Sequence, residues 1–385
     1  MAGSARRVMD SAALRQVRRL RDSQALPLTL ERLAALDNDR SSPSYTKQLA
    51  QRTHRDMKIR IAHRLNDFLH LPYKALTNQS FHYVYEKYVE AFLVHNDIGD
   101  IKSDSMAEDY WRALAQIFES NRVVTKYLGR GRNELARLDP ELVPRLDSFL
   151  DRFFSNRIGT HLTGAAFLHH AKVPSGSQKP ADAAFGVVQD TDVVASVRRL
   201  QDSLADIYKD DSVPIELEVE GVLTDWKAPS KVSIVYIPLH IRVILREIMQ
   251  NAVSANIRFA KFSHTRPHPV RVGVNRGRFG VFVTVSDRGG GIENLNRIWT
   301  WGPGRDVESQ PLTDEELDQS AMIEDENSSN TQPLPLGFGV PISRLVARFF
   351  GGDVQLRTLR GHGTNAYIHL PELQREGQLS SLDML

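Results

Sequence analysis

The first half of the chain has hydrophobic residues at spacings of three and four, which is the pattern of amphipathic helices. This spacing runs through residues 59–68, 84–92, 105–128, 132–138 and 141–171. Leu71-Pro72 and Asp139-Pro140 interrupt the pattern, because proline ends a helix or opens a new one. Several long helices with short connections predict an antiparallel bundle, similar to a four-helix bundle, over residues 42–173.

The pattern changes in the second half, where short hydrophobic runs rich in β-branched residues are separated by turn residues. Strand-like runs occupy residues 215–219, 232–237, 270–274, 281–285, 354–358 and 366–370. Helical segments are predicted at about 191–208, 239–258 and 340–350. The turn-rich segments 275–279 and 360–363 join neighbouring strands as hairpins. This order predicts an α/β sandwich, a mixed sheet with helices on one face, over residues 187–372.

Small and polar residues separate the two halves. The stretch Pro174–Pro180 has proline at both ends and Ser, Gly, Gln and Lys between them, which is typical of a linker. We therefore predict a linker over residues 174–186. After the last strand, residues 373–385 are predicted to form a C-terminal tail.

The N-terminal segment, residues 1–41, begins with an unusual charge pattern. Residues 1–22 contain six Arg, no Lys and two acidic residues. Met9, Ala13, Val17 and Leu20 recur at helical spacing. An amphipathic, Arg-rich and acid-poor start is typical of a mitochondrial transit peptide. The alternative is an ordinary basic first helix, and the sequence alone favours neither.

The composition restricts the function classes. The 385 residues include 49 Lys and Arg against 47 Asp and Glu, for a formal net charge of +2, which argues against a general nucleic-acid binder. The chain has no Cys, so disulfides, thiolate metal sites and a Cys nucleophile are excluded. No uninterrupted hydrophobic run approaches 18 residues, so we expect no membrane span.

The first candidate for chemistry is the pair Glu247 and Asn251, on the helix predicted after Pro238. Residues four apart lie on the same helix face. An Asn side-chain oxygen is a hard, neutral ligand that suits Mg²⁺, and a carboxylate one turn away can accept a proton from an attacking hydroxyl. The spacing alone is a weak signal, because it occurs by chance on many solvated helix faces.

The second candidate is Asp287–Ile292, which follows a predicted strand and contains three consecutive glycines. Glycine allows positive φ and a close approach of the backbone to a ligand. The Asp287 carboxylate at the strand end can accept a hydrogen bond from an exocyclic amine, such as that of adenine. The alternative is an ordinary glycine-rich turn.

The third candidate is Gly337-Phe-Gly-Val-Pro-Ile-Ser-Arg344, which opens a helix. Glycines at a helix start leave backbone N–H groups free to face phosphate, and the helix dipole favours the anion. Pro341 fits the first turn of the helix. Thr364, on the last predicted hairpin, can supply a hydroxyl. Each motif is weak alone, but their order and spacing together are a strong signal.

In this order the three motifs resemble the Bergerat ATP-binding fold of histidine kinases and type II topoisomerases. More narrowly, the segments 235–240, 287–292 and 337–353 are similar to the mitochondrial pyruvate and branched-chain 2-oxo acid dehydrogenase kinases. Strings in the helical half agree in the same order, at residues 60–65, 71–73, 85–92 and 156–159. The resemblance covers about residues 45–372. It implies a four-helix-bundle-like regulatory domain followed by a Bergerat-type ATP-binding kinase domain.

This resemblance also implies a function. Members of the family work in the mitochondrial matrix, where they use Mg-ATP to phosphorylate a Ser on the alpha subunit of a 2-oxo acid dehydrogenase complex and so inactivate it. By similarity, Glu247 is the candidate general base, Asn251 the Mg²⁺ ligand and Asp287 the adenine-binding residue. The other candidates for lining the nucleotide are Ser254, Gly289, Gly291, Gly337, Phe338, Gly339, Val340 and Thr364. The implied partners are that alpha subunit as substrate, the lipoyl-bearing core as docking site and a second copy in a homodimer.

The sequence departs from the family pattern at three positions of the site. Val243 stands where many pyruvate dehydrogenase kinases have a His beside the catalytic Glu, a His that branched-chain members also lack. Gln250 and Ser254 stand where the family usually has Lys and Arg, so two cations near the phosphates are missing. The leading hypothesis is a pyruvate dehydrogenase kinase. The alternatives are a branched-chain 2-oxo acid dehydrogenase kinase and a catalytically weak ATP-binding regulatory module on the complex.

A long acidic segment, about 302–336, lies between the two glycine motifs and has little hydrophobic periodicity. In the Bergerat fold this is the place of the ATP lid, and a loop of this length is usually functional or disordered. The alternative is a solvated insertion. The histidines at 169–170, 264 and 268 have no further ligands at clear spacing, so they predict no metal site.

Overall fold

The computed structural model describes residues 9, 11–37, 44–208, 213–220, 231–302 and 337–372. These residues form two compact units, each described here by itself. The helical unit takes in residues up to Leu28, Ala35–Val187 and Asn296–Ile342. The α/β unit takes in Thr29–Ala34, Val188–Leu295 and the residues from Ser343 onward. The predicted tail, 373–385, and all but the first residue of the predicted lid, 302–336, lie outside the described residues.

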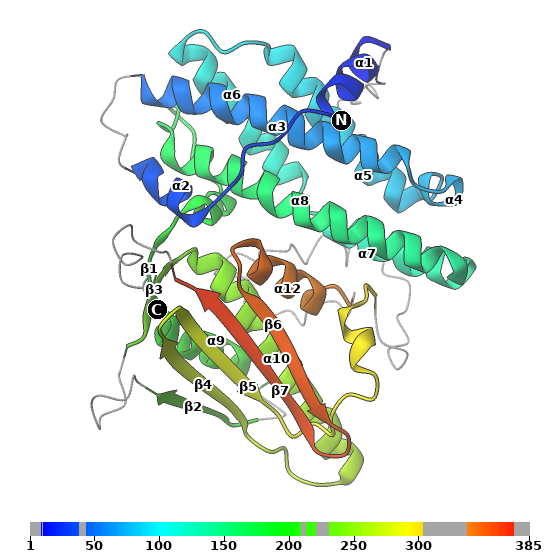
Figure 1. Cartoon of the computed structure of the whole chain (residues 1–385), viewed down its shortest axis with the longest axis vertical. Helices are drawn as coiled ribbons and strands as arrows, with labels where there is room; N and C mark the ends of the chain where they lie inside the picture. The colour runs from blue at the N-terminus through cyan, green and yellow to red at the C-terminus, as the bar shows by residue number, and fades with distance from the viewer. Residues whose placement is uncertain are drawn as a thin grey trace, which may run out of the picture. The chain divides into compact units, whose positions relative to one another are not determined.

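Long helices dominate the helical unit (Figure 1). Their hydrophobic sides meet around a cluster of buried aromatic rings at Phe68, Phe81, Phe149 and Phe153. The prediction of a helical first half is confirmed. The elements are α1 (Ser11–Leu20), η1 (Ala35–Asp37), α3 (Tyr45–Leu69), α4 (Tyr73–Leu76), α5 (Gln79–Ile98), α6 (Asp104–Ser120), α7 (Val124–Leu138), η2 (Pro140–Leu142), α8 (Val143–His170), η3 (Ala181–Gly186) and η5 (Leu295–Trp299).

The break between α6 and α7 lies at residues 121–123, and the predicted break near Gly129 and Gly131 is wrong. The main-chain oxygen of Asn121 at this break accepts hydrogen bonds from Arg157 Nη2 at 2.9 Å and from Val124 N at 3.2 Å, so the end of α6 is fixed from both sides. Gly131 lies inside α7 because α5 approaches closely there. A Cβ at this position would lie 2.7 Å from both Asn78 Oδ1 and the Phe81 ring.

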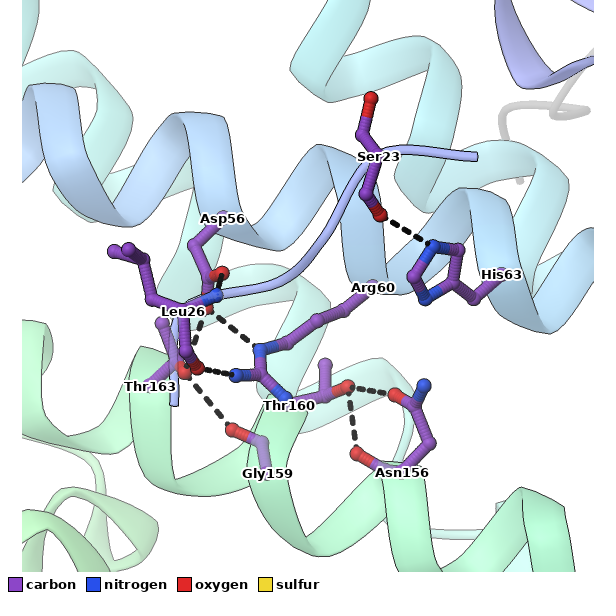
Figure 2. Close-up of polar contacts among 9 residues, drawn as sticks. All are labelled: Ser23, Leu26, Asp56, Arg60, His63, Asn156, Gly159, Thr160 and Thr163. Carbon is purple, nitrogen blue, oxygen red and sulfur yellow. Dashed lines mark hydrogen bonds and ion pairs between the residues drawn. The ribbon is translucent and has the colours of Figure 1, made fainter. Parts of the chain in front are cut away.

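The N-terminal segment is part of the helical unit. Helix α1 buries Ala13 and Val17 and packs on α3. After α1, main-chain atoms of Leu26 bind side chains of α3, as Figure 2 shows. The Leu26 N–H donates to Asp56 Oδ1 at 2.6 Å, and Arg60 Nη2 donates to the Leu26 oxygen at 2.6 Å. These contacts fix the segment after α1 to the helical unit, and the transit peptide stays a prediction.

Two ionic groups that anchor this segment are themselves buried and paired. Arg60 Nε donates to Asp56 Oδ2 at 2.6 Å, and Thr163 Oγ1 donates to the same oxygen at 3.2 Å (Figure 2). Both carboxylate oxygens of Asp56 are therefore used within the fold. A buried charge that is paired and hydrogen-bonded in this way serves the structure.

The predicted linker, residues 174–186, ends in the helix η3, which packs on α8. Gly186 lies so close to α8 that a Cβ there would be 2.2 Å from the main-chain nitrogen of Ala166. Residues 181–186 therefore belong to the packed helical unit. The sequence pattern gave no sign of this contact, because it depends on the missing side chain of one glycine.

The α/β unit is built on a mixed five-stranded sheet of order β2-β4-β5-β7-β6. β2 pairs with β4 in parallel, and the other neighbours are antiparallel, which confirms the predicted mixed sheet. The short strand β1 was not predicted; it pairs with β3 in a separate two-stranded sheet. The elements are α2 (Leu30–Ala34), β1 (Gln189–Asp192), α9 (Val193–Ile207), β2 (Ile215–Glu220), β3 (Ser233–Tyr236), α10 (Pro238–Ser263), β4 (Val270–Gly277), β5 (Gly280–Ser286), α12 (Gly339–Phe349), β6 (Asp353–Leu359) and β7 (Gly363–Pro371).

Alternation along the strands explains why helices cover the sheet. Val281, Val283 and Val285 of β5 are buried, whereas Phe282 between them is exposed. Helix α10 contacts both β4 and β5 and is drawn behind them in Figure 1. The hydrophobic stripe of α10 thus holds one face of this helix against the central strands and leaves another face for polar residues.

Candidate nucleotide-binding site

Helix α10 carries the first two candidate residues. Pro238 occupies its first turn, where a missing N–H costs nothing. The helix buries Ile244, Leu245 and Ile248, which leaves Glu247 half-buried and Asn251 exposed. Burial raises the pKa of the Glu247 carboxyl, and the neighbouring Arg246 partly offsets this pKa shift. A carboxylate with a raised pKa is a better proton acceptor for a hydroxyl.

Asp287 follows β5 and has two differently placed carboxylate oxygens. Its Oδ1 accepts hydrogen bonds from the main-chain N–H groups of Gly289 at 2.9 Å and Thr364 at 3.2 Å. Its Oδ2 accepts no hydrogen bond from any residue in the described ranges. Burial raises the pKa of Asp287, while the two main-chain donors lower it. The carboxylate is therefore oriented by the backbone, with one acceptor oxygen left for an external donor.

The glycines after Asp287 let this loop lie directly on its neighbours. A Cβ at Gly289 would be 2.5 Å from the Cβ of Ala255 on α10. Gly291 has φ of +75°, and a Cβ there would be 2.4 Å from the Leu359 oxygen at the end of β6. Both glycines are thus required by packing, independently of any ligand. The same packing brings the loop against α10 and the β6–β7 hairpin.

Thr364 is the second residue of β7, beside this loop, and is buried. Its main-chain oxygen accepts from Asp287 N at 2.9 Å, so the two residues are joined in both directions. The Thr364 hydroxyl lies 3.3 Å from Thr358 Oγ1, which also accepts from Ile292 N at 2.7 Å. The structure therefore brings Thr364 and the Asp287 loop together, as the sequence predicted for one site.

One supporting residue escaped the sequence analysis. Asn256 is buried on α10, and its Oδ1 accepts from Arg288 N at 2.9 Å while its Nδ2 donates to the His268 oxygen at 2.8 Å. It fixes the loop after Asp287 to the helix that carries Glu247 and Asn251. An Asn among the hydrophobic residues of a helix was the available signal, since a buried amide needs partners.

The third motif, residues 337–344, includes the start of α12. Its residues up to Ile342 belong to the helical unit, and Ser343 and Arg344 belong to the α/β unit. Gly337 has φ of +71°, and Gly337, Phe338, Gly339 and Val340 belong to the helical unit. The α/β unit brings together the other candidates, namely Glu247, Asn251, Ser254, Asp287, Gly289, Gly291 and Thr364. No group of three or more His, Asp or Glu side chains within the described ranges could hold a metal ion. Within those ranges, no helix is long and hydrophobic enough to cross a membrane.

Models of known protein families match both halves of the chain. The family model for mitochondrial branched-chain alpha-ketoacid dehydrogenase kinase matches residues 27–189. The model for histidine kinase-, DNA gyrase B- and HSP90-like ATPases matches residues 237–374. Both matches, together with the similar proteins below, support the family of pyruvate and branched-chain 2-oxo acid dehydrogenase kinases. This confirms the family that the sequence motifs suggested.

Full-length relatives of this kinase family agree with the assignment. The mitochondrial pyruvate dehydrogenase (acetyl-transferring) kinase of Arabidopsis thaliana is 28% identical, covering 84% of each chain. Isozyme 4 of the human mitochondrial pyruvate dehydrogenase kinase is 27% identical over 83% of this chain and 76% of its own. Isozyme 3 of the mouse is 24% identical over 96% of this chain and 86% of its own.

Two of the three positions where this kinase departs from its family pattern, Gln250 and Ser254, are joined in one hydrogen-bonded network. Tyr208, just after α9, bonds to Ser254 Oγ at 2.9 Å and accepts from Gln250 Nε2 at 3.4 Å. Gln250 is buried, and its amide oxygen has no hydrogen-bond donor within the described ranges. Where the family pattern has two cations, this chain has a neutral contact between α9 and α10. Tyr208 was not predicted, because its role depends on a contact 46 residues away.

Proposed function

We propose that this chain is a protein serine kinase that phosphorylates and inactivates the alpha subunit of pyruvate dehydrogenase, using Mg-ATP. The observation that carries the proposal is the Asp287 carboxylate, with one oxygen fixed by two main-chain N–H groups and the other free to accept. This arrangement fits the exocyclic amine of adenine. The names of the similar proteins support the choice of substrate.

Each remaining candidate has a role in this proposal. Glu247 accepts the proton of the substrate serine as the serine oxygen bonds to the γ-phosphorus and the bond to the β-phosphate oxygen breaks, so that ADP leaves. Asn251 supplies an oxygen ligand for Mg²⁺, which would neutralise phosphate charge when bound. The residues that would line the nucleotide are Ser254, Gly289, Gly291, Gly337, Phe338, Gly339, Val340 and Thr364.

The raised pKa of Glu247 supports its role as the base. Glu247 and Asn251 are one turn apart on a helix fixed against the sheet, so both would face the same bound phosphates. Orientation of the two groups by a rigid helix reduces the entropy lost on reaching the transition state. Ser254 has the weakest support among the nucleotide candidates, because its hydroxyl is already bonded to Tyr208.

Two alternative functions follow from particular observations. The helical half matches a family model that bears the branched-chain name, which favours the branched-chain 2-oxo acid dehydrogenase as substrate. The neutral network of Gln250, Ser254 and Tyr208 replaces two cations, which favours a catalytically weak ATP-binding regulator of the complex. Pyruvate dehydrogenase remains the first choice because the similar full-length proteins carry that name.

The setting of this activity is also proposed from the relatives. Their names place them in mitochondria, and we infer the same organelle for this chain, with the matrix as compartment. We further propose the lipoyl-bearing core of the complex as docking site and a homodimer as the working form. Because Ser11–Leu28 is folded onto α3, a presequence cleaved near residue 22 would remove contacts of the helical unit.

Deletion of the gene in its own organism tests the proposal. We expect loss of serine phosphorylation on the alpha subunit of pyruvate dehydrogenase, restored by the wild-type chain and not by Glu247→Gln. Loss confined to the branched-chain enzyme would select that alternative. Restoration by Glu247→Gln as fully as by the wild type would support the regulatory module and contradict the kinase mechanism. Loss of neither phosphorylation would contradict both kinase functions.

A further inference from the structure

Trp301 packs on helix α8 within the helical unit. The residues that surround it, Asp147, Asp151 and Phe154, form the Trp301 seat. The Trp301 ring is buried and stacks on Phe154, with centroids 4.8 Å apart. The indole N–H donates to Asp151 Oδ1 at 2.9 Å, and the main chain of Trp301 lowers the pKa of the nearby Asp147 carboxyl. Asp147 and Asp151 are one helical turn apart, so both carboxylates lie on the face of α8 that meets Trp301.

Gly302, the residue after Trp301, also packs closely against the helical unit. Gly302 has φ of +102°, and a Cβ there would lie 2.2 Å from Arg132 Nη1. Arg132 is fixed by Asp147, with its Nε and Nη2 at 3.1 and 3.3 Å from the carboxylate oxygens. The positive φ favours glycine at this position, which also leaves room for the Arg132 guanidinium. Through Arg132, α7 therefore also adjoins the Trp301 seat.

The seat also holds the chain that enters α12. Gly302 N–H donates to the Gly337 oxygen at 3.2 Å. The Phe338 ring lies edge-on to Trp301 and to Phe154, with centroids 4.8 and 5.7 Å apart. Residues 302 and 337 are thus adjacent in space. The glycine turn at Gly337–Gly339 is fixed by the same contacts that bury Trp301.

These contacts need an explanation beyond burial of a hydrophobic ring. Burial raises the pKa of Asp147, so its charge is kept here against a cost in solvation. Phosphate binding by itself requires neither a tryptophan at position 301 nor the carboxylates of Asp147 and Asp151. Their effect is to fix the main chain at Trp301 and, through Gly302, at Gly337.

We propose that Trp301 is a positioning residue, whose seat on Asp147, Asp151 and Phe154 holds the Gly337–Val340 turn in the conformation that accepts nucleotide phosphates. This inference rests on the proposed function, which assigns that turn to the nucleotide. It follows that nucleotide binding and the packing of α8 are coupled. Such coupling is reciprocal, since each event changes the equilibrium of the other by the same factor.

A matched pair of tryptophans in the full-length chain provides the test. Trp301→Phe keeps an aromatic ring on Phe154 and removes only the bond to Asp151. Trp111→Phe is the control, because Trp111 is equally buried in the same unit and its indole N–H donates to the Leu168 oxygen at 3.2 Å. Affinity for Mg-ATP is measured by calorimetry, and hydrogen exchange of residues 143–155 is measured with and without Mg-ATP.

We expect Trp301→Phe to weaken Mg-ATP about fivefold or more, the scale of ordinary coupling. Trp111→Phe should lower thermal stability and leave the affinity within about twofold. Mg-ATP should slow exchange in α8 of the wild type and not of Trp301→Phe. Asp151→Asn keeps an acceptor for the indole and should behave like the wild type.

Two results would overturn the inference. One is equal Mg-ATP affinity in the wild type and Trp301→Phe. The other is an equal loss of affinity in Trp301→Phe and Trp111→Phe, which would mean that the ring is merely structural. A wild-type chain that does not bind Mg-ATP at all would instead contradict the proposed function, so the two failures are distinguishable.

Discussion

Two aspartates, the buried Asp56 and the half-buried Asp287, show how the units use charge differently. In the helical unit, both oxygens of Asp56 are bonded, to Leu26 N–H on one side and to Arg60 and Thr163 on the other. In the α/β unit, Asp287 has one oxygen bonded twice by the backbone and the other without a donor in the described residues. A charge whose two oxygens are bonded within the protein stabilises a fold, whereas an oriented carboxylate with one oxygen left unused by the described residues is prepared for a ligand.

The largest expected effect comes from breaking the satisfied pair. Arg60→Met leaves the Asp56 carboxylate buried without its charge partner, and we expect a loss of about 3–5 kcal/mol in the free energy of unfolding. Chemical denaturation measures it. Arg112→Met, at the exposed pair with Asp109, is the control and should cost less than about 1 kcal/mol. Equal small losses in both variants would contradict a structural role for Asp56 and Arg60.

The next effect concerns the base. Glu247→Gln keeps the shape of the side chain and removes the proton acceptor, so we expect at least about a hundredfold loss in phosphoryl transfer. Affinity for Mg-ATP should change little, because the substitution leaves Asp287 and Thr364 intact. Single-turnover kinetics together with calorimetry separate the two quantities. Near-normal transfer would remove Glu247 from the mechanism.

The free energy of unfolding should also depend on pH, because the helical unit buries two histidines, His54 and His95. His95 donates from Nδ1 to the Ala91 oxygen at 2.7 Å, and Tyr110 lies 3.4 Å from its Nε2. His54 is stacked on it, with centroids 5.8 Å apart. Burial lowers the pKa of His95 from 6.5 to about 4 and also lowers the pKa of His54.

Because the folded pKa is lowered, the unfolded chain takes up the proton first as the pH falls. The stability is fully present above pH 6.5 and is lost progressively down to about pH 4. The loss due to His95 should reach about 2 kcal/mol by pH 5. Denaturation across this range measures it, and His95→Phe should flatten the profile while substitution of the exposed His70 by Gln leaves it unchanged. An unchanged slope in His95→Phe would exclude His95 as the titrating group.

The smallest effect tests the acceptor role of Asp287 directly. Asp287→Ala leaves the adenine amine without its partner, which costs about 1–3 kcal/mol, so ATP should bind about tenfold more weakly or worse. The wild type should discriminate against GTP, whose base presents a carbonyl where adenine has the amine. Calorimetry with both nucleotides measures this. Equal affinity for ATP and GTP would contradict the adenine-binding role.

The sequence predicted the parts of the site that depend on local spacing. Glu247 and Asn251 share a face because they are four residues apart, and Asp287 ends a strand that alternation made visible. Tyr208 and Trp301 could not be predicted, because their partners lie 46 and 150 residues away. Asn256 left only a weak signal on its helix.

The errors in the predicted fold have the same physical origin. The sequence pattern interrupts the helix between residues 128 and 132, yet Gly131 in this stretch serves the close contact of α7 with α5 at Phe81. The second half of the predicted linker is η3, fixed on α8 through Gly186. Glycine is ambiguous in sequence, since both a turn and a close helix contact require the absence of a side chain.

The most direct test of the central claim is phosphate transfer in a purified system. The full-length chain is incubated with Mg²⁺, γ-labelled ATP and purified pyruvate dehydrogenase complex, and in parallel with the branched-chain complex, and the labelled residue is mapped. We predict label on a serine of the pyruvate dehydrogenase alpha subunit, with Glu247→Gln at least about a hundredfold slower. Label on neither alpha subunit, from a chain that binds Mg-ATP, would contradict the kinase function.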